Sequence, residues 1–135
     1  MNLIKSEIMA KKYKILIVED DRALLKVLSD QLGREKKLEI ISARDGQEAL
    51  DIIKDDKPDL ILLDLVMPRV DGLEVIQKVR ADKHWGITVP IIVLTSLSDV
   101  ETIGGVTEQN VHDFLVKTDW RVEDVVRKVK EKLGI

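Results

Sequence analysis

Residues 59–64, Asp59-Leu60-Ile61-Leu62-Leu63-Asp64, place four aliphatic side chains between two carboxylates. A short apolar run without alternation is typical of a strand covered on both faces, as in a parallel sheet with helices on either side. We therefore predict a buried parallel strand over Asp59–Leu63, with Asp64 directly after its carboxyl end.

Four further stretches are rich in Ile, Leu and Val and predict strands: Lys14–Val18, Leu38–Ala43, Pro90–Leu94 and Val111–Val116. Between the stretches, and after the last one, apolar residues recur every three or four positions, which predicts amphipathic helices. Strict alternation of strand and helix predicts an α/β domain with five helices on the two faces of a doubly wound, five-stranded parallel sheet. We expect the fourth helix to be weak, because Gly104 and Gly105 each disfavour it by about 1 kcal/mol relative to alanine.

Length and composition predict one globular domain. The chain has 135 residues, of which 44% are hydrophobic and 35% charged. We assign residues 12–135 to this domain and residues 1–11, which lack strong periodicity, to an N-terminal extension. The apolar runs are too short to span a membrane and cysteine is absent, so we expect a cytoplasmic protein without membrane segments or disulfides. A net charge of -3 disfavours direct binding to nucleic acid.

Polar side chains follow four of the five predicted strands. They are Glu19, Asp20 and Asp21 after the first strand, Asp64 after the third, Thr95 and Ser96 after the fourth, and Lys117 after the fifth. The carboxyl ends of parallel strands meet at one edge of the sheet, where ligands bind. Single Asp, Ser or Thr residues at such places usually cap the next helix, but the sequence offers its own candidate caps: Asp21, Asp45, Asp71, Ser98, and Thr118 or Asp119. The residues left without a capping role are Glu19, Asp20, Asp64, Thr95 and Lys117.

These residue types indicate phosphoryl chemistry. Three carboxylates in one place repel one another unless a cation neutralises them, and Mg²⁺ prefers carboxylate oxygens. His84 and His112 are isolated in the sequence, which argues against zinc. The ammonium group of Lys117 and the hydroxyl of Thr95 suit an anion with several oxygens. A carboxylate can accept a phosphoryl group as a nucleophile, and Asp64 is the natural candidate.

Residues 13–133 resemble the receiver domains of two-component response regulators, in particular the stand-alone, chemotaxis-type receivers. The resemblance rests on five segments: Ile15-Leu16-Ile17-Val18-Glu19-Asp20-Asp21, Leu62-Leu63-Asp64-Leu65-Val66-Met67-Pro68, Val70-Asp71-Gly72-Leu73-Glu74, Ile92-Val93-Leu94-Thr95-Ser96 and Phe114-Leu115-Val116-Lys117. It implies a flavodoxin-like fold with strand order 2-1-3-4-5.

The resemblance also implies roles for individual residues. Asp64 would accept phosphate from a sensor histidine kinase or a histidine phosphotransfer protein, and Lys117 would pair with the phosphoryl oxygens. Mg²⁺ would be held by Asp20, Asp64 and the backbone carbonyl of Val66, with Glu19 acting mostly through water and Asp21 completing the acidic group.

Thr95 and Phe114 would be the switch residues, with Ser96 beside Thr95. The fourth helix, fifth strand and fifth helix would then present the signal to a downstream effector, and phosphorylation would allow a homodimer through the same face. We expect the chain to be a phosphoacceptor that assists its own phosphotransfer and dephosphorylation, and not an enzyme in the usual sense.

One departure from the family and two alternatives remain. The family usually has a cis proline after the lysine, whereas this chain has Thr118, which predicts a trans peptide and a shifted loop that alters the reach of Lys117. An aspartate-nucleophile phosphatase would usually carry a second aspartate two residues beyond the first, where this chain has Val66. A phosphorylation-independent pseudo-receiver that only binds partners is the other alternative, and binding of Mg²⁺ would distinguish it.

Overall fold

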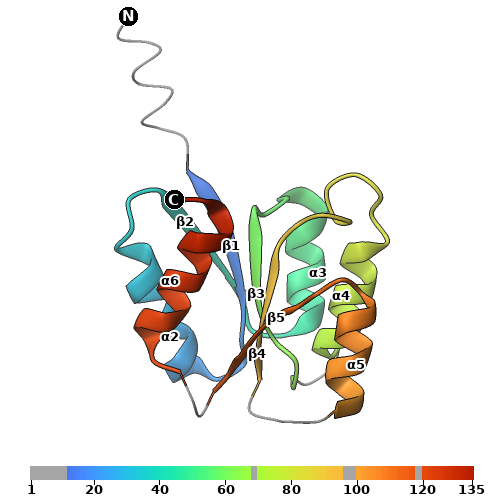
Figure 1. Ribbon diagram of the computed structural model, residues 1–135. Helices are drawn as coiled ribbons and strands as arrows, with labels where there is room; N and C mark the ends of the chain where they lie inside the picture. The colour runs from blue at the N-terminus through green and yellow to red at the C-terminus, as the bar shows by residue number, and fades with distance from the viewer. Residues whose placement is uncertain (1–11, 68–69, 96–99, 118–119) are drawn as a thin grey trace, which may run out of the picture.

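A computed structural model of the chain describes residues 12–67, 70–95, 100–117 and 120–135, with the backbone alone over 100–103. Strands and helices alternate along these residues (Figure 1). The elements are β1 (Tyr13–Val18), α2 (Arg22–Gly33), β2 (Leu38–Ala43), α3 (Gly46–Asp55), β3 (Leu60–Asp64), α4 (Gly72–Arg80), β4 (Ile91–Thr95), α5 (Val100–Glu108), β5 (Asp113–Val116) and α6 (Val122–Leu133). None of the described helices combines the length and the apolar character needed to cross a bilayer. The predicted extension, residues 1–11, lies outside the described residues.

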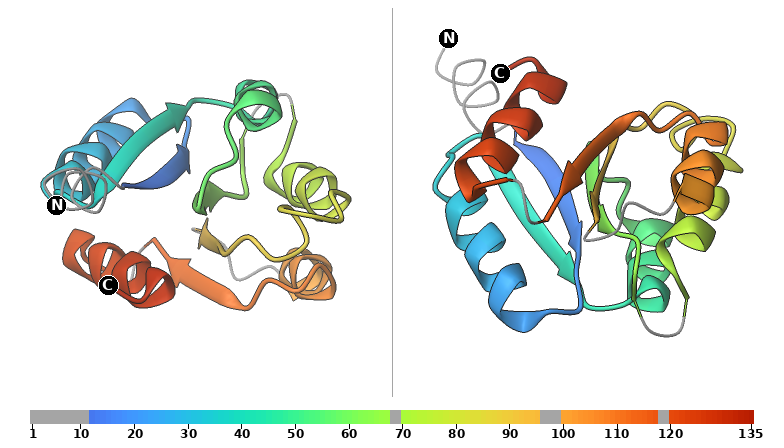
Figure 2. Two further views of the ribbon diagram at one scale, coloured as in Figure 1. Left: turned by 90° about the horizontal axis from the view of Figure 1, so that it is seen from above. Right: turned by 60° about the horizontal axis from the view of Figure 1, so that its bottom comes forward.

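The strands form one parallel sheet in the order β2-β1-β3-β4-β5, which confirms the predicted doubly wound fold. Helices α2 and α6 cover one face of the sheet, and α3, α4 and α5 cover the other (Figure 2). Residues 38–43 mix polar with apolar side chains, which suits their place in the sheet. Strand β2 lies at the edge of the sheet, and its middle residues are only partly buried or exposed.

The central strands supply both hydrophobic cores, because successive side chains of a strand point to opposite faces. On β3, Leu63 packs into the core under α3, α4 and α5, whereas Leu62 packs into the core under α2 and α6. Both side chains are fully buried. Burial of each leucine side chain stabilises the folded state by about 1.5–3 kcal/mol. The tightly packed sheet therefore holds the ends of its strands in fixed positions.

Two predicted strands are displaced by one residue. Strand β3 ends at Asp64 and β4 ends at Thr95, so both residues belong to the sheet instead of following it. The register explains this, because Asp64 pairs with Leu94, and the N–H of Leu65 donates to the carbonyl of Leu94. The last strand begins at Asp113, two residues later than predicted.

Three of the predicted helix caps are confirmed. Asp21 accepts hydrogen bonds from the first turn of α2, Asp45 from Glu48 N in α3, and Asp71 from Glu74 N in α4. Ser98 lies outside the described residues.

The predicted start of the last helix at Thr118 or Asp119 is wrong. Helix α6 begins at Val122 with Arg121 as its N-cap. The reason is a carboxylate further along the chain, because Asp124 Oδ2 accepts a hydrogen bond from Arg121 N at 2.8 Å and so fixes the start of the helix there.

Arg80, the last residue of α4, ties three segments together. Its guanidinium donates to the carbonyls of Gly86 and Val89 in the turn before β4, and to those of Gln109 and Asn110 after α5. Asn110 has a positive φ of 59°, a left-handed conformation that asparagine adopts more readily than most residues. The carboxyl-terminal end of α5 is therefore anchored to α4.

Asp113 joins the edge strand β5 to α6 through Lys132 Nζ at 2.6 Å and Lys128 Nζ at 3.1 Å. Burial by itself would raise the pKa of Asp113, but the two lysines outweigh it and hold the pKa below its usual value. The ion pairs therefore stabilise the fold above the unfolded pKa of about 3.9 and are lost as the pH falls through the lower folded pKa.

We expect Asp113→Asn to lower the free energy of unfolding by about 1 kcal/mol at neutral pH. The difference from the native chain should shrink as the pH is lowered to about 3, as measured by urea unfolding at each pH. Asp30→Asn is the matched control, since the Lys26–Asp30 pair is largely exposed and should contribute little. A difference for Asp113→Asn that persists at low pH would contradict the ion-pair explanation.

Candidate functional site

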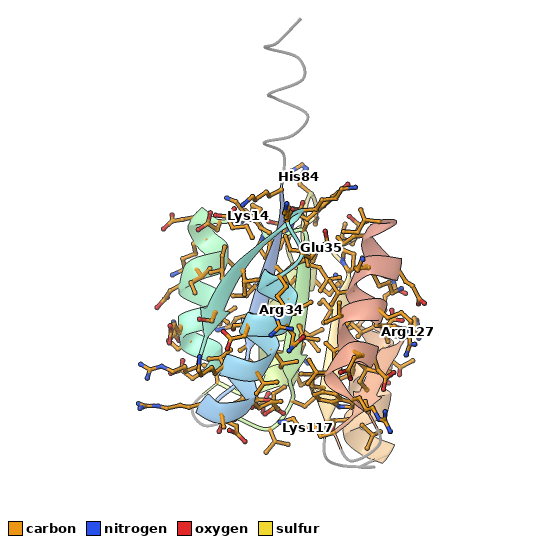
Figure 3. The ribbon with its side chains drawn as sticks, turned by 90° about the vertical axis from the view of Figure 1, so that its left-hand side faces the viewer. Lys14, Arg34, Glu35, His84, Lys117 and Arg127 are labelled. Carbon is orange, nitrogen blue, oxygen red and sulfur yellow. The ribbon has the colours of Figure 1, made fainter. Side chains whose placement is uncertain are left out.

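The candidate site lies at the carboxyl ends of the strands. Glu19 and Asp20 directly follow β1, Asp64 ends β3, Thr95 ends β4 and Lys117 directly follows β5. Figure 3 shows Lys117 at this end of the molecule, opposite to Lys14 and His84. Because β1, β3, β4 and β5 are consecutive neighbours in the sheet, residues that are far apart in the sequence meet here.

Three carboxylates form a compact cluster at this edge. Each of Glu19, Asp20 and Asp64 offers a carboxylate oxygen, and these oxygens all lie within 4.8 Å of one another. Glu19 and Asp64 are buried, at 0% and 3% exposure, whereas Asp20 is open to solvent. The cluster therefore has a closed inner side and an open outer side through which a ligand can reach Asp64.

Lys117 reaches the cluster directly. Its Nζ lies 3.1 Å from Asp64 Oδ2 and 2.7 Å from Glu19 Oε1. Its backbone N–H donates to the carbonyl of Thr95 at 2.6 Å, which ties the end of β5 to the end of β4. The expected change in the reach of Lys117 is thus not large enough to remove it from the carboxylates. The Lys117–Thr118 peptide lies outside the described residues.

The electrostatics of the cluster follow from its burial. Burial raises the pKa of Glu19 to about 7, against the opposing effects of Lys117 and of the hydrogen bond from Asp21 N. Burial by itself would lower the pKa of Lys117, but Glu19 and Asp64 outweigh it and raise that pKa. The contacts thus favour a charged lysine, whereas burial disfavours the charged form of Glu19.

The backbone around Asp64 and Glu19 orients both side chains. Asp64 Oδ1 accepts a hydrogen bond from Val66 N at 3.1 Å, which leaves Oδ2 toward Lys117. Glu19 Oε2 accepts a hydrogen bond from Asp21 N at 3.2 Å, and Glu19 N donates to the carbonyl of Ala43 on the neighbouring strand β2. The two carboxylates are therefore held by the sheet and its loops before any ligand arrives.

A family model for the response regulator receiver domain matches residues 15–130. The chain belongs to this family. Receiver domains are modules of two-component signalling, and this receiver is similar to a probable transcriptional regulator, ycf27, of Porphyridium aerugineum. The two are 39% identical over 126 residues, which cover 88% of this chain and 50% of that protein.

Further relatives agree with this membership. The response regulator MprA of Mycolicibacterium vanbaalenii is 37% identical over 121 residues, which cover 89% of this chain and 50% of that protein. Among solved structures, the phosphorylated cyanobacterial phytochrome response regulator RcpA matches with a TM-score of 0.78 and 27% identity, covering 89% of this chain and 92% of that one. This receiver spans about half the length of the curated relatives it matches.

The remaining predicted site residues lie around the cluster. Thr95 is buried at the end of β4, and Phe114 on β5 is half-buried against the core under α3, α4 and α5. The carboxylate of Asp21 caps the N-terminus of α2, and Asp21 is not one of the three residues of the acidic cluster. The Val66 side chain is 54% exposed beside Asp64. Ser96 lies outside the described residues.

The donor set of this receiver fits Mg²⁺. Receiver domains generally bind this ion at an acidic pocket, and the cluster of Glu19, Asp20 and Asp64 supplies hard oxygen ligands at one point. One of the three carboxylates is exposed, which leaves room for the water ligands that Mg²⁺ retains. Since Lys117 alone does not balance the carboxylates, a cation there would relieve their repulsion.

Sequence reasoning missed Gly72 as a residue of the site. An ideal Cβ on Gly72 would lie 2.6 Å from Leu65 Cα and 2.7 Å from the carbonyl oxygen of Asp64. Gly72 N also donates to the carbonyl of Leu65 at 3.1 Å. The helix α4 thus packs directly on the backbone that carries Asp64. A glycine at the first position of a helix, where no turn requires it, was the available signal.

Proposed function

We propose that this receiver is a phosphorylation-activated switch, in which Asp64 accepts a phosphoryl group and the face formed by α5, β5 and α6 then changes to control a partner. The observation that supports the proposal most strongly is the contact of Lys117 Nζ with Asp64 Oδ2 at 3.1 Å, within the acidic cluster. A lysine held on a buried carboxylate is suited to the charge that develops on transferred phosphoryl oxygens.

In the proposed reaction, a carboxylate oxygen of Asp64 attacks the phosphorus atom of the donor. The new bond joins this oxygen to phosphorus, while the bond from phosphorus to the donor's leaving group breaks. Lys117 balances charge on the phosphoryl oxygens, and the Thr95 hydroxyl moves toward them. Phe114 then changes its packing, and because it has no hydroxyl, packing alone drives that change.

We further propose that Glu19, Asp20, Asp64 and the backbone carbonyl of Val66 hold Mg²⁺, with Glu19 acting mostly through water. When bound, this ion would supply positive charge that lowers the repulsion between the incoming phosphoryl group and the carboxylates. The buried position of Glu19 and Asp64 supports this role, because buried carboxylates are poorly compensated by water.

The proposal extends to partners and boundaries. The phosphoryl donor is a sensor histidine kinase or a histidine phosphotransfer protein, and the recipient of the signal is a downstream effector protein. Residues 12–135 form the receiver domain after an N-terminal extension, 1–11. The phosphorylated chain uses the α5–β5–α6 face for the effector or for a second copy of itself.

Intact mass spectrometry tests the central claim. After incubation with acetyl phosphate and Mg²⁺, we expect the chain to gain one phosphoryl group, and the same incubation with excess EDTA should give almost none. The reason is that three closely spaced carboxylates repel the anionic donor when no cation is present. A folded chain that binds Mg²⁺ but gains no phosphoryl group would point to the pseudo-receiver alternative.

Hydrogen exchange tests the change at the α5–β5–α6 face. Phosphorylation should alter amide protection across residues 98–110, because α5 carries two adjacent glycines, of which Gly104 is exposed and has no atom within 4 Å of an added Cβ. The strand β2, at the opposite edge of the sheet, is the internal control and should keep its protection. Equal protection of residues 98–110 in the phosphorylated and unphosphorylated chain would contradict the proposed output face.

A further inference from the structure

A groove of about 270 Å³ lies between α3 and α4, which are neighbours on the same face of the sheet (Figure 1). The carboxylate cluster and Lys117 do not contribute to its lining. It extends to the turn that carries His84 and Trp85, at the end of the molecule opposite to Lys117 (Figure 3). The groove is therefore a separate surface of the receiver and not an extension of the phosphorylation site.

The lining of this groove has two parts. The first is apolar and consists of the buried Ile53 and Val79 with the partly buried Leu50 and Trp85. The Trp85 ring is held in place, because its indole N–H donates to the carbonyl of Pro58 at 2.6 Å. A fixed tryptophan beside an apolar depression is the usual form of an anchor site for a partner's side chain.

The second part is a rim of three lysines, Lys54, Lys57 and Lys78, whose side chains are 75%, 46% and 56% exposed. Against them, Asp82 is the one acidic residue among the described residues of the lining, and its Oδ1 accepts a hydrogen bond from the N–H of His84. The described lining therefore holds three lysines against one carboxylate, although the whole chain has a net charge of -3.

These lysines are also incompletely paired. Their nearest carboxylate oxygens, on Asp51, Asp82 and Glu74, lie 3.9, 3.7 and 3.7 Å away, beyond ordinary hydrogen-bond length. Some lysines elsewhere contact a carboxylate directly, as Lys132 does with Asp113 at 2.6 Å and Lys130 with Glu35 at 3.1 Å. Lys57 additionally lies 5.1 Å from the centre of the Trp85 ring. The rim thus keeps ammonium donors available for a ligand.

We infer that the α3–α4 groove docks an acidic segment of a partner protein, with one large apolar side chain of that segment against Trp85 and its flanking carboxylates on Lys54, Lys57 and Lys78. Charge complementarity selects an acidic occupant. The volume of about 270 Å³ accommodates one large apolar side chain of such a segment. We expect the docking not to require phosphorylation, since none of the described site residues lines the groove.

The test is NMR titration of the unphosphorylated chain with a capped peptide in which phenylalanine is flanked on each side by two glutamates. The indole N–H resonance of Trp85 should shift and saturate. That of Trp120, which packs in the other core with α2 and α6, is the internal control and should stay in place. A matching peptide with glutamines instead of glutamates should bind about tenfold more weakly.

Two double variants complete the test. Lys54→Gln with Lys78→Gln should weaken binding of the acidic peptide by about tenfold, because it removes rim charge without creating like-charged pairs with Asp51 or Glu74. Lys26→Gln with Lys36→Gln makes the same charge change outside the groove and should leave the affinity unchanged.

Several results would overturn the inference. They are the absence of a Trp85 shift, equal binding of the acidic and neutral peptides, and equal loss of affinity in both double variants. A Trp85 resonance that moves with protein concentration alone would identify a second copy of the chain as the occupant. Binding of phenylacetate as tight as that of the acidic peptide would identify a small-molecule site.

Discussion

Asp64→Asn is expected to abolish phosphorylation. In acetyl phosphate and Mg²⁺, the variant should gain phosphoryl mass at least about 100-fold more slowly than the native chain, because an amide lacks the anionic oxygen that attacks phosphorus. The substitution also removes the negative charge that Lys117 contacts at 3.1 Å. Its Oδ1 can still accept from Val66 N, so we expect the variant to fold.

Asp59→Asn is the matched control for this experiment. Asp59 directly precedes β3, at the other end of the strand that carries Asp64, and its carboxylate accepts a hydrogen bond from Lys14 N at 2.7 Å. This variant should be phosphorylated at the native rate. Circular dichroism should show that both variants are folded. Phosphorylation of Asp64→Asn at the native rate would place the phosphoryl group on another residue and remove the basis of the proposed switch.

Gly72→Ala is expected to destabilise the fold strongly and to disturb the site as well. The added Cβ would meet Leu65 Cα at 2.6 Å and the carbonyl oxygen of Asp64 at 2.7 Å, and neither backbone atom can yield as a flexible side chain would. We expect the free energy of unfolding to fall by about 2–3 kcal/mol. Phosphorylation should also be slower below the melting transition, because α4 would be pushed away from the segment that carries Asp64.

Gly33→Ala provides the control for this substitution. A Cβ on Gly33 has no atom within 4 Å, and this glycine also lies in a helix, at the end of α2. Alanine there should leave stability unchanged or raise it by up to about 1 kcal/mol. Urea unfolding of the three chains measures these differences. Native stability and phosphorylation of Gly72→Ala would show that α4 can shift without disturbing Asp64.

Features encoded in short segments could be predicted from the sequence. The apolar run Leu60–Leu63 indicated a strand buried on both faces, and the structure confirms it. In the caps at Asp21, Asp45 and Asp71, a carboxylate accepts a hydrogen bond from a backbone N–H group two or three residues further along the chain. A local sequence pattern was therefore sufficient to predict them. The meeting of Glu19, Asp20 and Asp64 followed from the geometry of parallel strands, given the strand order.

Features that depend on contacts between distant segments could not be predicted. The one-residue shift of the strand that ends at Asp64 comes from its pairing with Leu94. The distance from Lys117 to Glu19 depends on how the end of β5 is tied to Thr95. In both cases the deciding interaction lies in the packing, beyond the local pattern. The start of α6 was missed for a different reason, because its deciding bond, from Arg121 N to Asp124 Oδ2, spans only three residues and the sequence offered an earlier carboxylate at Asp119.

The four carbonyl contacts of Arg80 constrain how α5 can respond to a signal. They fix Gln109 and Asn110, just beyond the last turn of α5, to the end of α4 and to the turn before β4. Because that end is fastened, we expect any displacement of α5 in the proposed switch to be a swing about Asn110 and not a sideways translation. In such a swing, the end of α5 farthest from Asn110 would move most. This end lies near Val100 and follows Thr95 in the chain.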